Sequence, residues 1–417
     1  ATRFALCLPT NLTHTRCPRR ERYRPRDKAL RHSVVIAAGA PRNYERVLEG
    51  GIIDPVFFGF GFGYLVQEEH AVIYIGMDVH QKSTTFCLFD PSAEKDRQYR
   101  TVTRPTTVEG IREVLKPHDG RCQVAYEVGT QAQWVAQIVR PLASEVQVAN
   151  PSRIPWLFRD GRKNDSIDAR KLATLLYLQQ LPQVHLPAPD VAAWRALINH
   201  RRTLVKRRTT AKLQIRTILR AFQTPCAFKN CWTKRGVTWL KSLTFDAARD
   251  LMMRTLLEEL EFMDRKVLEI EQQLDALAKI QSQVALVRTI PGVGPRTAEA
   301  IVAFADGADR FGDGRRFASY FGMTPTLDAS GGVERHGHIS KRGPSVVRWV
   351  LVEAAYVVIR RCPAMRAFYD RVRHGKKDRT KKAIVAVGRK VLTIAYAMMR
   401  KGVAFDPGKV GVGRVAA

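Results

Sequence analysis

The chain has 417 residues, of which 45% are hydrophobic, enough for two or three domains with buried cores. It carries 69 Lys and Arg against 39 Asp and Glu, a formal net charge of +30, which favours a polyanionic partner such as nucleic acid. No apolar run approaches the roughly 20 residues that span a bilayer, which argues against a membrane partner.

The first 70 residues differ from the rest. They are rich in Arg and Pro at the start, then irregular, with no sustained helical or strand period. No methionine precedes Met77. We expect residues 1–70 to be a translated upstream region or a disordered basic tail, outside the working enzyme.

Residues 71–181 alternate between strand and helix patterns. Apolar or alternating runs predict strands at 71–79, 83–90, 98–104, 123–128 and 145–149. Helical spacing predicts helices at 106–116, 131–142 and 165–178, the last capped by Asn164 or Asp165. The predicted order is three strands followed by a helix, a strand, a helix, a strand and a helix. This is the order of an α/β ribonuclease H-like domain.

A helical arm is predicted over residues 182–287. It begins with a Pro-broken linker, followed by long helices at 191–221 and 245–287. Their apolar positions suit either an antiparallel hairpin or a dimerising coiled coil, so packing within the chain and contact with a partner fit equally well.

The first of these helices is strongly basic. No acidic residue lies between Asp190 and Asp246, a stretch rich in Lys and Arg. Phosphate groups are the natural partners of such a surface. We expect it to bind nucleic acid through Arg201, Arg202, Lys206, Arg207, Arg208, Lys212 and Arg216.

We expect residues 288–402 to form a third, mostly helical domain and residues 403–417 to form a flexible tail. Pro291 to Gly294 reads Pro-Gly-Val-Gly between two helices, which resembles a helix-hairpin-helix element. Gly292 and Gly294 permit a tight turn whose backbone amides approach phosphate. A plain turn between helices is the alternative.

Four acidic residues are expected to converge in the α/β domain. Asp78 ends the first strand and Glu127 the fourth, and these strands are neighbours in the ribonuclease H order. Asp165 and Asp168, three residues apart, share one face of the following helix. Four carboxylates repel one another unless a cation lies among them, and hard oxygen ligands suit Mg²⁺ or Mn²⁺. Capping and helix-dipole roles are the structural alternatives.

Ser330 lies before two glycines in a polar segment expected to be a loop. The neighbouring cations Arg335, Lys341 and Arg342 are predicted to contact nucleic acid. A serine hydroxyl needs a base or a metal to become nucleophilic. Taken alone, Ser330 is a turn residue.

The seven cysteines are scattered and predict neither a disulfide framework nor a zinc site. Cys226 and Cys231 lie near each other but without a second pair. We therefore expect a reducing cytoplasm.

Together these motifs resemble the insertion-sequence transposases of the IS110 type, in its IS1111 branch. The matching segments are Gly76–His80, Tyr126–Gly129, Lys163–Arg170, Ile290–Gly294, Phe317–Gly332 and Ile339–Gly343. The resemblance covers roughly residues 71–401. It departs from the family at the start, because family members place the first Asp within the opening dozen or so residues.

The resemblance implies a RuvC-like DEDD domain made by Asp78, Glu127, Asp165 and Asp168, then a coiled-coil arm and a transposase domain. Ser330 becomes the nucleophile that forms a covalent link to DNA. The acidic site of one protomer would meet the serine of another in a dimer or tetramer. A noncoding guide RNA encoded by the element would pair with donor and target DNA. The protein would be bacterial and cytoplasmic, associated with the nucleoid when bound to DNA.

Two alternatives remain open from the sequence. A Holliday-junction resolvase would use the same four carboxylates to activate water, without a serine, although it has no need of the domain after Ile290. A non-catalytic nucleic-acid-binding relic would keep the fold without the chemistry. Intact Asp78, Glu127, Asp165, Asp168 and Ser330 argue against decay.

Overall fold

The computed structural model describes residues 72–150, 164–330 and 333–410. The predicted N-terminal extension, 1–70, and most of the predicted tail lie outside the described residues. No helix in the described ranges is both long and apolar enough to cross a membrane.

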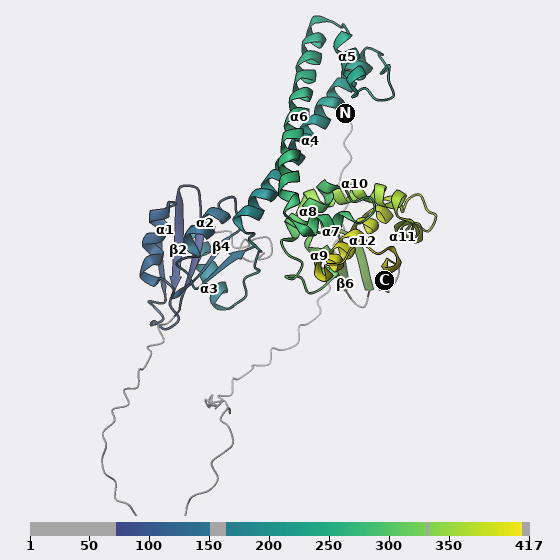
Figure 1. Ribbon diagram of the computed structural model, residues 1–417. Coiled ribbons are helices and arrows are strands. Elements are labelled where there is room, and N and C mark those ends of the chain that lie inside the picture. The colour runs from purple at the N-terminus through teal and green to yellow at the C-terminus, as the bar shows by residue number, and fades with distance from the viewer. Residues whose placement is uncertain (1–71, 151–163, 331–332, 411–417) are drawn as a thin grey trace, which may run out of the picture. The chain divides into compact units, whose positions relative to one another are not determined.

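A five-stranded sheet forms the first domain (Figure 1). Its strands are β1 (Ile73–Val79), β2 (Ser83–Phe89), β3 (Tyr99–Pro105), β4 (Cys122–Glu127) and β5 (Glu145–Ala149). Their order in the sheet is β3-β2-β1-β4-β5. β1, β4 and β5 run parallel, whereas β2 is antiparallel to β1 and β3. The predicted α/β domain is confirmed, with β1 and β4 as neighbours.

Alternation along the strands divides the buried side chains between two faces. The described helices of this domain are α1 (Val108–Leu115), α2 (Ala132–Val139) and α3 (Asp165–Tyr177), with a 3-10 turn at Lys116–His118. Met77 and Tyr126 pack with side chains of α1 and α2. Ala125 packs on the other face with α3, which contacts β1, β2 and β4. The sheet therefore lies between two helical layers.

The arm consists of α4 (Pro189–Ala221), α5 (Lys234–Ser242) and α6 (Ala247–Lys279). Arg201 pairs with Glu271 and Arg208 with Asp264, so later residues of α4 meet earlier residues of α6. The two long helices thus pack as an antiparallel hairpin within one chain. The short helix α5 was not predicted, and its Leu240 is fully buried in a cluster with side chains of α4 and α6.

Two predictions about the arm were wrong. The single helix expected over 245–287 ends at Lys279, because Gln281 is extended (φ −108°, ψ 94°) and a separate helix α7 begins at Ser282. Cys226 and Cys231, two of the cysteines predicted to make no disulfide framework, form a disulfide across a Cα separation of 6.1 Å. The turn that joins α4 to α5 brings the two backbones within the usual range for such a bond.

The C-terminal domain has one large core. Its elements are α7 (Ser282–Arg288), α8 (Pro295–Ala305), α9 (Gly314–Tyr320), β6 (Pro325–Ser330), β7 (Val333–Ile339), α10 (Ser345–Arg361), α11 (Pro363–Arg373) and α12 (Thr380–Lys401), then a 3-10 turn at Pro407–Lys409. Trp194 and Ile198 of α4 and Leu274 of α6 belong to the same core, so the base of the arm is anchored in it. The prediction of a polar loop at Ser330 was wrong, because β6 and β7 pair as an antiparallel hairpin.

Candidate functional site

Two of the predicted acidic residues lie at the carboxyl ends of neighbouring strands. β1 and β4 are parallel, and their last paired residues are Met77 and Tyr126. Asp78 and Glu127 follow these residues directly. Because side chains alternate along a strand, both acids lie on the face opposite Met77 and Tyr126, which is the face that α3 covers.

The first turn of α3 supplies the other two acids. Asn164 caps the helix by accepting a hydrogen bond from the Ser166 N–H at 3.1 Å, and Asp165 and Asp168 follow in the first turn. α3 lies very close to β1, because Gly76 has no side chain and a Cβ there would overlap the carbonyl oxygen of Ala169. Asp165 and Asp168 therefore lie beside the end of β1, because they are in the first turn of α3 and Gly76 lets this helix pack closely on the strand.

Three polar side chains form the tightest group at this sheet end. His80 Nε2 lies 3.3 Å from Asp78 Oδ2 and 3.4 Å from Asp165 Oδ1. One ligand atom from each of Asp78, His80 and Asp165 lies within 4.8 Å of the others. Glu127 is half-buried outside that group, and Asp168 lies 4.0 Å from the Lys171 ammonium. The structure thus brings Asp78 and Asp165 together directly and keeps the other two acids nearby.

The electrostatics of Asp78 suit a bound cation. Burial raises the pKa of this carboxyl, His80 lowers it, and the carboxylates of Asp165 and Asp168 raise it again. A cation among these groups would stabilise their charged forms. The donor set of carboxylate oxygens and one imidazole fits a divalent ion, and Mn²⁺ accepts both donor types.

His80 is the member of this group that sequence reasoning missed. It follows Asp78 by two residues, and alternate residues of an extended chain point to the same side. That spacing was a usable signal in the segment Gly76–His80. The contact between His80 and Asp165 could not be predicted from the sequence, because that contact depends on how α3 packs against the sheet.

Ser330 is the last residue of β6, where it pairs with Val333 of β7. Its side chain lies outside the described part of the structure, so its role as a nucleophile stays a prediction. Arg335, Lys341 and Arg342 on and after β7 are exposed, as expected for residues that bind nucleic acid.

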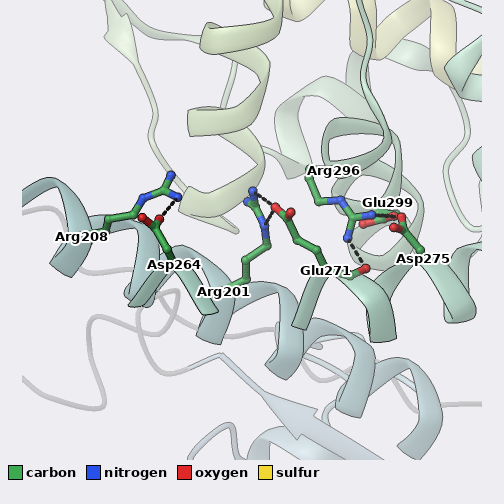
Figure 2. Close-up of polar contacts among 7 residues, drawn as sticks. All are labelled: Arg201, Arg208, Asp264, Glu271, Asp275, Arg296 and Glu299. Carbon is green, nitrogen blue, oxygen red and sulfur yellow. Dashed lines mark hydrogen bonds and ion pairs between the residues drawn. The ribbon is translucent and has the colours of Figure 1, made fainter. Parts of the chain in front are cut away.

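Some of the predicted cations of α4 pair with groups of the same chain, as Figure 2 shows for Arg201 and Arg208, and others are exposed. Arg201 Nε donates to Glu271 at 2.7 Å and Arg208 Nη1 to Asp264 at 2.9 Å, so these two face α6 and hold the hairpin together. Arg202 donates to the Ser345 hydroxyl at 2.8 Å. The exposed members of the predicted set are Lys206, Arg207 and Arg216.

Aromatic contacts involve two cations near the tip of the arm. Lys212 and Arg216 lie 5.1 Å and 5.6 Å from the centre of the Trp232 ring, within cation–π distance. Arg216 remains exposed to solvent, whereas Lys212 is half-buried. This pairing of cations with a tryptophan positions the loop before α5 against α4.

The two glycines of the Pro-Gly-Val-Gly turn differ in environment. Gly292 has a φ of +95°, and a Cβ there would lie 2.6 Å from the Val358 amide nitrogen of α10. Close backbone packing therefore explains Gly292 without a ligand. Gly294 is exposed at the N-terminus of α8 with open space around it, so its predicted contact with phosphate remains sterically open.

Two sequence families match the chain. Residues 75–223 match the DEDD-type IS110 family, described as "Transposase". Residues 284–370 match the "Transposase IS116/IS110/IS902 family". The first covers the sheet domain, the linker and α4, and the second begins in α7 and ends in α11.

Named relatives agree with these matches. A "Probable family 20 transposase" of Pseudomonas aeruginosa is 26% identical over 300 residues, covering 69% of this chain and 86% of the relative. The transposase for insertion sequence element IS1111A of Coxiella burnetii is 26% identical over 246 residues, covering 57% and 66%. A "Pilin gene-inverting protein" of Moraxella bovis is 34% identical over 142 residues, covering 33% and 43%.

Both halves of a DEDD-type transposase are therefore present in the expected order, and the chain is a DNA transposase. It belongs to the IS110 family of insertion-sequence transposases. A DEDD-type domain with an acidic group at its sheet end fits a divalent metal.

Proposed function

We propose that this transposase moves an insertion sequence by cutting and rejoining DNA with a Mg²⁺- or Mn²⁺-dependent acidic site and a serine nucleophile, guided by an RNA that the element encodes. The observation that supports this most directly is the convergence of Asp78, His80 and Asp165 at the end of β1. Carboxylates gathered in this way on a basic, DNA-acting chain match phosphodiester chemistry.

Asp78 and Asp165 are the residues that would hold the metal, with Glu127 and Asp168 beside them on the same face. A bound divalent cation stabilises negative charge on the oxygens of the reacting phosphodiester. His80, within 3.4 Å of both aspartates, orients their carboxylates and is a further ligand for Mn²⁺.

Ser330 is the proposed nucleophile. Its hydroxyl oxygen bonds to phosphorus as the bond from phosphorus to one strand oxygen breaks, and that oxygen leaves as a strand hydroxyl. The serine proton passes to a base in the same step, and that base or water returns a proton to the leaving oxygen. The product is a phosphoserine link, which conserves the bond energy needed to rejoin the strands. Arg335, Lys341 and Arg342 near the hairpin supply positive charge for the phosphates.

The arm and the turn before α8 support nucleic-acid binding. Lys206, Arg207 and Arg216 offer exposed charge to RNA and DNA backbones, and Gly294 leaves the start of α8 open in a helix-hairpin-helix arrangement. Base pairing of the guide would then choose donor and target. Exposed apolar side chains on α6, among them Phe262 and Leu268, support a coiled-coil contact between protomers of a dimer or tetramer.

The decisive experiment is a search for the covalent intermediate. The full chain is incubated with Mg²⁺, the DNA ends of the parent element and its flanking transcript, then run on a denaturing gel. Wild type is compared with Ser330→Ala and Asp78→Asn. We expect a protein–DNA adduct in wild type alone, with nucleic-acid binding kept in both variants.

Other outcomes separate the alternatives. An adduct that survives Ser330→Ala would sink the serine assignment. Metal-dependent cleavage without any adduct would indicate a water-using nuclease of the resolvase type. If neither product forms, the chain is a binding relic. Omitting the transcript tests the guide, because a guided enzyme loses the adduct without it.

A further inference from the structure

A groove lies between the β6–β7 hairpin and α12 in the C-terminal domain. Its volume is about 640 Å³, within the range of about 300–1,000 Å³ typical of ligand sites. Met323, Ile339, Val385 and Ala386 give it an apolar lining. None of these residues belongs to the acidic site or to the proposed contacts of the arm.

Cations surround this apolar lining. Lys341 follows β7, and Lys381, Lys382 and Arg389 come from α12. Among the described residues that line the groove, none is acidic. Burial lowers the pKa of Arg389, and repulsion from the neighbouring Arg315 lowers it further. An anionic ligand would relieve that repulsion.

An apolar recess edged by cations suits one nucleotide better than a duplex. In a duplex the flat faces of the bases are stacked inside and only base edges, sugars and phosphates are presented, so an apolar recess cannot receive a whole base. A single strand can turn one base outward into an apolar surface while its phosphates remain on lysines.

We propose that this groove binds one unstacked nucleotide of a single nucleic-acid strand, with the base against Met323, Ile339 and Val385 and the adjoining phosphates on Lys381 and Lys382. The inference rests on the proposed action on DNA and RNA and adds a site to it. Pro325 and Ile339 pair at one end of the hairpin, and Ser330 and Val333 at the other. Five residue steps of strand, about 16 Å, separate the two ends. The groove is therefore too far from Ser330 to hold the nucleotide joined to the serine, and it holds another nucleotide of the bound nucleic acid.

Photocrosslinking tests this assignment directly. The full chain is irradiated with oligonucleotides carrying 5-iodouracil, in EDTA so that no strand is cut, and adducts are mapped by mass spectrometry. Three probes are compared, which are single-stranded DNA, single-stranded RNA and duplex DNA. We expect adducts on the segments 323–341 or 381–389 with a single strand and about tenfold fewer with the duplex. The strand that reacts identifies whether DNA or RNA occupies the groove.

Two variants and a control make the test specific. Ala386→Phe fills the groove without changing charge, and we expect it to reduce adducts on these segments about tenfold while adducts elsewhere persist. Lys381 and Lys382 are exposed, and the double variant Lys381→Gln/Lys382→Gln should lower the number of adducts on these segments similarly. It should also reduce the salt dependence of binding. Lys376→Gln/Lys377→Gln makes the same charge change on the exposed turn before α12 and should leave them unchanged.

Equal adducts with the duplex, or adducts on these segments that survive Ala386→Phe, would overturn the proposal. So would adducts confined to the arm. Because the assay contains no metal and forms no phosphoserine, its outcome is independent of strand cleavage. Loss of the serine adduct in the earlier experiment with groove adducts retained would reject the proposed chemistry and leave this site standing.

Discussion

Glu299 of α8 is a carboxylic acid held inside the C-terminal core (Figure 2). It is fully buried, and neither of its oxygens has a hydrogen-bond partner among the described residues, although the Arg296 guanidinium lies 3.1 Å from Oε1. We attribute this to an ion pair whose orientation does not satisfy a hydrogen bond. Burial raises the pKa of Glu299 to about 7, against the opposing effect of Arg296.

This burial predicts a pH-dependent stability. The folded pKa of about 7 exceeds the reference value of 4.5, so protonation stabilises the fold below pH 4.5 and that contribution is lost as the pH rises through 7. Glu299→Gln should therefore gain stability relative to wild type between pH 5 and pH 8, by at most about 3 kcal/mol. Urea unfolding of both proteins at pH 5 and at pH 8 measures this difference in the free energy of unfolding. The exposed Glu353→Gln on α10 is the control, and a difference independent of pH would contradict the prediction.

At the scale of elements, the contact between β1 and α3 determines the geometry of the acidic site. Gly76 lets the helix backbone lie directly on the strand, with Ala169 and Ala173 against it. The same contact places Asp165 beside Asp78. Asp78 follows Gly76 by two residues along β1. Stability of the sheet domain and the shape of the site are therefore coupled through one position.

A methyl group at residue 76 should separate these elements. Gly76→Ala introduces an overlap with the α3 backbone, and overpacking of this kind costs about 1–3 kcal/mol. We expect lower unfolding stability together with weaker Mn²⁺ binding, measured by thermal unfolding and titration calorimetry. Gly129→Ala has open space around its Cβ and should change stability little. Unchanged metal binding in Gly76→Ala would show that α3 does not position the site.

At the scale of the whole molecule, the acidic group and Ser330 belong to different domains. If the proposed site combines the acids of one protomer with the serine of another, defects in the two domains complement each other. Asp78→Asn and Ser330→Ala, each inactive alone, should then form the adduct when mixed. The control mixes Asp78→Asn with the double variant Asp78→Asn/Ser330→Ala. No protomer in that mixture carries Asp78, so no complete site can assemble. Failure of the first mixture would place both groups in one protomer.

Local patterns were sufficient for most of the sheet domain. β5 has the predicted limits, and α3 begins at Asp165 behind the Asn164 cap, because strand alternation and capping are properties of neighbouring residues. The position of Asp165 and Asp168 in the first turn of that helix likewise predicted that they approach Asp78. The family followed from motifs in a fixed order, and the comparisons confirmed it.

Other features depended on contacts between distant segments. Composition, strand and helix patterns and motif order were enough to predict a basic α/β and helical transposase with carboxylates at one sheet end. The packed fold was needed to show that His80 approaches Asp165, and that Arg201 and Arg208 face α6. It also decided that α6 ends at Lys279 and that a hairpin replaces the expected loop at Ser330. The reason is physical, since a side chain's spacing along its own element says where it can point, and only the packed partner says what it meets there.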